Sequence, residues 1–130
     1  MDVHLTDLQL AIVRVLWERG ECTVAATQAA LLPERPLAQT TVATILTRLE
    51  KRGVVAHRPN GRQFVYRALV TEGDVRISMV RELTQMLFGG SSAALINHVL
   101  HDRGVSEQEF GELRRIVAAA GERAERANAA

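Results

Sequence analysis

The sequence predicts an α+β fold that is mainly α-helical and carries one small β-hairpin. Apolar residues recur at helical spacing in several stretches, and one stretch carries the i, i+3, i+4, i+7 stripe Val42, Ile45, Leu46 and Leu49. Asn60-Gly61 stands between two short β-prone runs, and Asn-Gly is the strongest local signal for a hairpin. Glycines separate the amphipathic stretches after residue 70, so short helices are expected there.

Two helices are expected in the first part of the chain. Thr6 followed by Gln9 has the pattern of a capping box, which begins a helix that reaches about Arg19. Thr23 is the expected N-cap of a short second helix over residues 24–32. Two prolines then prevent this helix from running into the next one.

A third helix is expected over residues 40–52, where Gly53 ends it. A two-stranded hairpin with Asn60-Gly61 at its tip follows at once. Three helices and a hairpin within about 70 residues are the arrangement of a winged helix-turn-helix. Residues 1–70 are therefore predicted to be a winged helix-turn-helix DNA-binding domain.

The distribution of charge supports contact with nucleic acid. The net charge is only +1, but residues 35–67 hold seven basic residues against one acid, Glu50. In the sequence, no carboxylate stands among the basic residues of the hairpin to balance them. A positive footprint confined to one motif suits phosphate contact, because each neutralised phosphate releases condensed counterions.

The third helix is expected to read bases, because a recognition helix enters the major groove with its N-terminal residues. Threonine hydroxyls can donate to or accept from bases, and arginine can contact guanine in a bidentate manner. The expected base-reading residues are Thr40, Thr41, Thr44 and Arg48. The expected phosphate contacts, which fix register, come from the end of the helix and from a basic wing at about residues 57–64: Lys51, Arg58 and Arg62. The alternative for both sets is an ordinary solvated surface.

Residues 71–130 are predicted to be a helical dimerisation segment. Thr71, Ser91 or Ser92, and Ser106 are the expected starts of three helices, whereas the final stretch GERAERANAA is poor in apolar residues and is expected to fray. Short amphipathic helices cannot bury their apolar faces alone, so a second copy is the expected partner. The expected dimerisation residues are Val75, Met79, Leu83, Met86, Leu95, Val99 and Leu113. A ligand pocket on the first four is the alternative.

The sequence gives little support for a metal site, a catalytic site, a disulfide or a membrane-spanning segment. His98 and His101 beside Asp102 have a spacing that metal ligands use, but a solvated helix face explains them better, so no metal or cofactor is expected. No nucleophile–base constellation or phosphate-binding glycine loop is present, so no enzymatic activity is expected. The single cysteine, Cys22, excludes an internal disulfide. No apolar run approaches the ~20 residues that cross a bilayer, and no signal peptide is evident, which predicts a cytoplasmic protein without membrane insertion.

Four stretches resemble the penicillinase-repressor family of bacterial regulators, the BlaI/MecI/CopY type. They are LTDLQLAIVRVLWERGECTV, TTVATILTRLEKRGVVAHRPNGRQFVYRALV, LFGGSSAALINHVL and VSEQEFGELRRIV, and the resemblance covers about residues 4–120. It implies a homodimeric transcriptional repressor whose winged helix binds palindromic, double-stranded operator DNA. Repression rather than activation rests on this resemblance alone. The alternatives are a winged-helix regulator with a small-molecule pocket and a winged-helix protein-interaction module without sequence-specific DNA binding.

The chain departs from the family pattern in two places. The copper-responsive branch carries Cys-x-Cys pairs near its C-terminus, and this sequence has none. The β-lactam-responsive branch is inactivated by cleavage of an Asn-Phe bond, and here Asn97-His98 lies at about that place. The resemblance thus implies release by proteolysis at Asn97-His98, with a membrane sensor metalloprotease as partner, although His98 stands where the family has phenylalanine.

Overall fold

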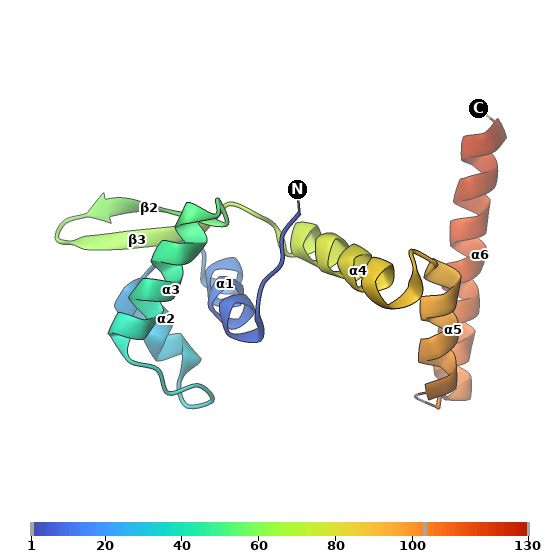
Figure 1. The fold of residues 1–130 in the computed structure, drawn as a ribbon, viewed down its shortest axis with the longest axis horizontal. Coiled ribbons are helices and arrows are strands. Elements are labelled where there is room, and N and C mark those ends of the chain that lie inside the picture. The colour runs from blue at the N-terminus through green and yellow to red at the C-terminus, as the bar shows by residue number, and fades with distance from the viewer. Residues whose placement is uncertain (1, 103, 130) are drawn as a thin grey trace. The chain divides into compact units, whose positions relative to one another are not determined.

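The computed structural model describes residues 2–102 and 104–129, and this part of the chain is mainly helical with one small antiparallel sheet (Figure 1). The predicted fold class is therefore confirmed. In chain order the elements are α1 (Asp7–Arg19), β1 (Cys22–Thr23), α2 (Val24–Leu31), α3 (Gln39–Lys51), β2 (Val55–Asn60), β3 (Gln63–Ala68), α4 (Glu72–Phe88), α5 (Ser92–Asp102) and α6 (Glu107–Ala129).

The first unit of the molecule is built around one apolar core. Helices α1, α2 and α3 contact one another, and the sheet contacts all three. The predicted stripe of α3 faces this core, because Val42, Leu46 and Leu49 are all 0% exposed. Burial of each such side chain contributes roughly 1.5–3 kcal/mol. The core therefore fixes the rotation of α3 about its axis and leaves its threonine-rich face toward solvent.

The helix starts follow the predicted caps. The Thr6 hydroxyl accepts a hydrogen bond from the Gln9 backbone N–H at 3.2 Å, and the Thr6 N–H donates to the Gln9 side chain at 3.0 Å. Thr23 caps α2 in the same way by accepting from the N–H of Ala26 at 3.0 Å. Helix α3 differs, because its N-cap is Ala38 and no side chain caps it.

The predicted hairpin of β2 and β3 is present, and a third strand that the sequence did not predict joins it in one sheet. Strand β3 lies in the middle, and β1 pairs with it through Cys22↔Tyr66 and Thr23↔Val65. A strand of two residues is too short to show an alternating pattern in the sequence.

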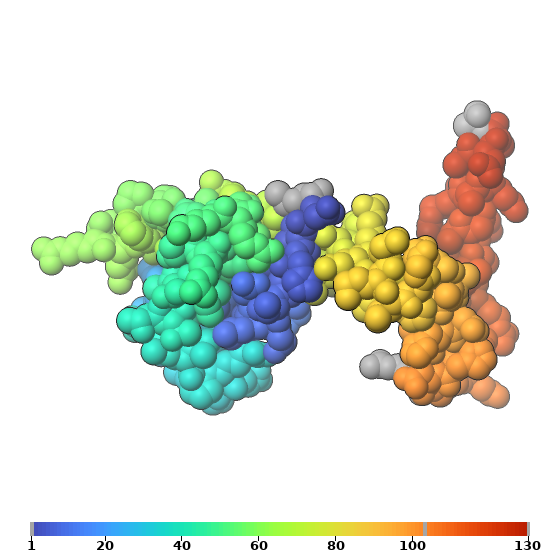
Figure 2. Space-filling model, viewed as in Figure 1, coloured from blue at the N-terminus to red at the C-terminus, as the bar shows by residue number. Residues whose placement is uncertain are grey.

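The tip of the hairpin also lies one residue later than expected. Asn60 pairs with Gln63, so Gly61 and Arg62 are the two residues of the turn. Gly61 has a φ of +66°, whereas no non-glycine residue in the described parts of the chain has a positive φ. This is the pattern of a type II′ turn, which requires glycine at its first central position. Arg62 thus stands at the tip itself. In Figure 2 this hairpin extends beyond the helices of the first unit.

Contacts divide the chain into two compact units, the first ending at Leu83 and the second beginning at Thr84. The boundary expected from the sequence lay between residues 70 and 71. The difference arises because Val75, on α4, is only 3% exposed and belongs to the core of the first unit, against which Met79 also packs. The side chain of Val75, which was predicted for the dimer interface, is thus already covered within its own chain.

The second unit contains the end of α4 together with α5 and α6. Gly89 and Gly90 have positive φ and end α4, as expected, and the Ser91 hydroxyl caps α5. The stretch predicted to fray is helical as far as Ala129, where α6 ends, and its last residue lies outside the described residues. Alanine is the strongest helix former, and an i,i+4 ion pair joins Glu122 and Arg126 at 3.7 Å.

Neither α5 nor α6 has a buried residue among those described. Both helices carry large apolar side chains that stay at least 40% exposed in the single chain, namely Ile96, Val99, Phe110, Ile116 and Val117. Most of the apolar surface of these helices is therefore uncovered.

Candidate DNA-binding surface

The predicted base-reading residues gather on the exposed face of α3. Thr40, Thr41, Thr44 and Arg48 line one shallow depression together with Ile45. All four polar side chains are exposed, because the apolar stripe holds the opposite face of the helix against the core. Lys51 is exposed at the C-terminal end of the same helix.

The hydroxyl of Thr44 has a defined orientation. It donates to the backbone carbonyl of Thr40 at 2.9 Å, and Thr47 donates to Ala43 in the same way at 2.9 Å. A hydroxyl has one hydrogen and two lone pairs, so Thr44 presents only acceptor lone pairs to an approaching ligand. In the major groove, the amino groups of adenine and cytosine are the complementary donors.

Three of the predicted cationic contacts have no partner within residues 2–102 and 104–129. Neither an ion pair nor a side-chain hydrogen bond engages Arg48, Lys51 or Arg62 there. Arg52, by contrast, donates to the His4 carbonyl and to Gln9, so it ties α3 to the N-terminal segment. The unpartnered cations can therefore bind an anion without first breaking a contact.

Arg58, on β2, is already paired with a carboxylate. Its Nη2 lies 2.6 Å from Oε2 of Glu21, and its Nε donates to the same oxygen at 2.9 Å. The hydrogen bond from Arg58 lowers the pKa of Glu21, and the same bond raises the pKa of Arg58. The expectation that no carboxylate balances the wing was thus wrong. Glu21 immediately precedes β1, and the pairing of β1 with β3 brings Glu21 to the hairpin.

The single acid of the basic stretch, Glu50, joins α3 to the wing. The His57 backbone N–H donates to Oε2 of Glu50 at 3.0 Å, and Nδ1 of His57 lies 2.6 Å from Oε1. The imidazole also packs on Phe64, with 4.4 Å between ring centroids. These contacts connect the end of α3 to both strands of the hairpin. The sequence pattern did not reveal them, because a spacing of seven residues across a turn has no local signature.

The residues predicted for other roles lie mostly in the second unit. Leu83, Met86 and Val99 are 41%, 72% and 45% exposed, while Leu95 and Leu113 are partly buried. Asn97 and His98 lie inside α5, where the Asn97 carbonyl accepts a hydrogen bond from Nδ1 of His101 at 2.8 Å. The His98 ring packs on Phe88, with 5.7 Å between ring centroids.

The described parts of the chain contain neither a cluster of metal-binding side chains nor a helix that could cross a membrane. No three histidine, cysteine, aspartate or glutamate side chains in residues 2–102 and 104–129 are grouped so that they could hold a metal ion. Over the same residues, every helix is too short or too polar to cross a bilayer.

Comparison with known proteins decides the family. The family model described as penicillinase repressor matches residues 5–119. The chain belongs to the penicillinase repressor family. The penicillinase repressor of Bacillus licheniformis is 24% identical over 114 residues, which cover 88% of this chain and 89% of that protein. The methicillin resistance regulatory protein MecI of Mammaliicoccus sciuri is 20% identical over 114 residues, which cover 88% of this chain and 93% of that protein. The resemblance inferred from the motifs is confirmed.

A solved structure confirms the architecture of the first unit. The DNA-binding domain of the repressor BlaI matches with a TM-score of 0.50 and 28% identity, over 57% of this chain and 93% of that domain. This member of the penicillinase repressor family therefore consists of a winged helix followed by further helices. The first of the two sequence relatives above is named a repressor and the second a regulatory protein.

Proposed function

We propose that this penicillinase repressor family member is a homodimeric transcriptional repressor that binds palindromic operator DNA. The observation that carries the proposal is the grouping of Thr40, Thr41, Thr44 and Arg48 around one depression on the exposed face of α3. Arg48, Lys51 and Arg62 add positive charge that no residue in the described ranges neutralises. Repression itself rests on membership of the family.

Each part of this surface has a distinct role in the proposal. Thr44 accepts a hydrogen bond from an adenine or cytosine amino group, and Arg48 forms a bidentate contact with guanine. Lys51 and Arg62 contact phosphates on the two sides of the groove and fix the register. The start of α3 has no side-chain cap, so its first backbone N–H groups are available to a further phosphate.

The dimer is proposed because the second unit lacks a core of its own. Not one described residue of α5 or α6 is buried, and exposed apolar side chains continue along the end of α4 at Leu83, Met86 and Leu87. A second copy that covers these side chains would supply the missing burial. Two copies related by a two-fold axis read two half-sites about one helical turn, or a multiple of it, apart, so the operator is palindromic.

Release by proteolysis at Asn97-His98, through a membrane sensor metalloprotease, is the mode of induction carried over from the family. The bond lies within α5, so that helix must open before a protease can bind it in extended form. The repressor would act in the cytoplasm, where operator DNA lies.

The experiment is to capture fragments of the source genome on the purified full chain at near-physiological salt and to sequence them. We expect enrichment of a palindrome upstream of a few genes, together with sedimentation as a dimer at micromolar concentration. If no fragment were enriched over competitor DNA, the protein-interaction reading would replace this proposal. If a palindrome were enriched by a monomer, only the dimer would be withdrawn.

A further inference from the structure

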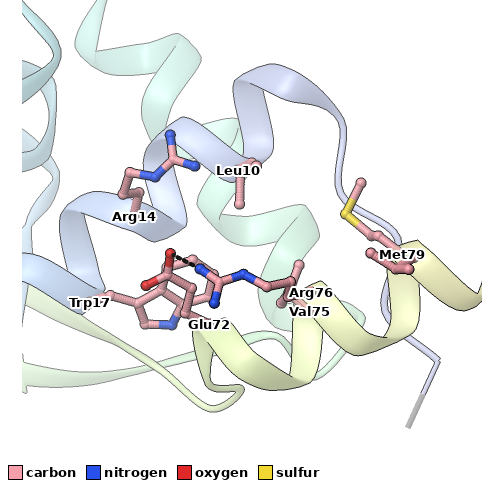
Figure 3. A pocket seen from close by; sticks show the side chains of 8 residues that line it. Leu10, Arg14, Trp17, Glu72, Val75, Arg76 and Met79 are labelled. Carbon is pink, nitrogen blue, oxygen red and sulfur yellow. Dashed lines mark hydrogen bonds and ion pairs between the residues drawn. The ribbon is translucent and has the colours of Figure 1, made fainter. Parts of the chain in front are cut away.

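We propose that a cavity between α1 and the first half of α4 binds a small aromatic monocarboxylate. The cavity has a volume of about 220 Å³ and lies wholly within the first unit of the molecule. Figure 3 shows its walls, with Leu10, Arg14 and Trp17 coming from α1 and with Glu72, Val75, Arg76 and Met79 coming from α4. None of these side chains belongs to the proposed DNA-binding surface, so this inference stands independently of that function.

The volume limits the size of the ligand. An apolar cavity of about 150 Å³ in another protein is large enough to take up benzene. Sites for drug-sized molecules occupy about 300–1,000 Å³. The cavity of about 220 Å³ therefore has room for a single six-membered ring with one small substituent.

The walls of the cavity favour an aromatic ring. Leu10, Val75 and Met79 provide apolar surface, and a methionine sulfur makes favourable contacts with an aromatic ring. Trp17 is held in place, because its indole N–H donates to the carbonyl of Val70 at 2.8 Å. A fixed indole face is a preformed stacking surface, so the site loses little conformational entropy when a flat ring binds.

The charged side chains around the cavity favour a ligand that carries one negative charge. Nη2 of Arg76 is paired with Oε1 of Glu72 at 2.9 Å, so these two groups balance each other. Arg14 lines the cavity from α1 and has no ion pair or hydrogen-bond partner in the described part of the chain. One uncompensated guanidinium beside an apolar cavity matches a single carboxylate, which it binds through two parallel hydrogen bonds. Together, the size, walls and charge of the cavity specify a ligand like benzoate.

The intrinsic fluorescence of Trp17 provides the assay, since it is the only tryptophan in the chain. Benzoate is titrated into the full-length protein at constant ionic strength, with benzamide as the uncharged isostere and acetate as the charge without the ring. We expect a saturable change in Trp17 fluorescence with benzoate, and at least tenfold weaker binding of benzamide and of acetate. A linear response to benzoate, or an equal response to benzamide, would overturn the proposal.

Two variants test the assigned groups. Arg14→Gln is expected to weaken benzoate binding about tenfold or more, because it removes the charge-assisted pair. Arg19→Gln, on the same helix but outside the cavity, serves as the matched control and is expected to leave benzoate binding unchanged. Glu72→Gln is expected to tighten benzoate binding, since it removes the neighbouring negative charge. Equal benzoate affinity in the Arg14→Gln variant and in the wild type would disprove the site.

Discussion

Replacement of Glu21 by glutamine is expected to tighten DNA binding. Arg58 is the only predicted phosphate contact that the structure pairs with a carboxylate, at 2.6 Å from Glu21 within the described residues. To reach a phosphate, the guanidinium has to exchange one anion for another. Glutamine keeps the shape of the side chain at position 21 but removes its charge, so Arg58 becomes available without that exchange.

The size of the effect follows from the exposure of the pair. The side chains of Arg58 and Glu21 are 55% and 37% exposed, and solvent-exposed ion pairs are weak. The gain is therefore modest, about two- to fivefold in affinity for each protomer. It should shrink as salt rises, because the Debye length falls from about 10 Å at 0.1 M to about 3 Å at 1 M.

The assay is a binding titration of operator duplex at several salt concentrations. Glu18→Gln is the matched control, because Glu18 is an exposed acid near the end of α1 that forms no ion pair within the described residues. The two variants have the same net charge, so only a specific effect separates them. In an Arg58→Gln background, Glu21→Gln should lose its advantage over the control. Weaker binding by Glu21→Gln alone would show that Glu21 positions Arg58 for DNA, and the reasoning would fail.

Three further predictions concern single residues. Arg48→Ala is expected to cost about 1–3 kcal/mol on the palindrome and to relax its preference over altered sites; an unchanged preference, measured by competition, would remove α3 from base reading. Arg62→Ala should weaken binding to every sequence alike and reduce the slope of log K against log salt by about 1, whereas an unchanged slope would remove the wing from the interface. Hydrogen bonds from the backbone N–H of Thr71, and then from its hydroxyl, hold the pKa of Asp74 below its ordinary value. The ionised Asp74 side chain stabilises the fold above its unfolded pKa of about 4, and this stabilisation is lost as the pH falls through the folded pKa. Asp74→Asn should therefore lower the free energy of unfolding at pH 7, and lower it progressively less as the solution is made acidic. Urea unfolding at pH 7 and at acidic pH measures this difference.

Features of the fold that depend on local chemistry were predictable from the sequence. The capping box at Thr6 and the helix start at Thr71 are each set by residues within one helical turn of each other. The buried stripe of α3 was equally predictable, because helical periodicity determines which side chains share a face.

Features that depend on distant segments were not predictable. Glu21 and Arg58 are 37 positions apart, and only the pairing of β1 with β3 brings them together. Periodicity identified the apolar face of α4 but not the surface that covers it, so Val75 was assigned to a partner although it packs in its own chain. A ligand pocket on the apolar stripe of α4 was the alternative expectation, and Val75 and Met79 of that stripe do line the cavity, but its α1 wall could not be predicted for the same reason.

The central claim is that the exposed face of α3 recognises one DNA sequence. The most direct measurement is the ratio of affinities of the full chain for the captured palindrome and for a scrambled duplex of the same length and composition, at near-physiological salt. Specific sites are typically bound at least about 10³-fold more tightly than non-specific DNA, and we predict a ratio of this order. Equal affinities for the two duplexes would contradict base recognition by α3, even if both were bound in a salt-dependent manner.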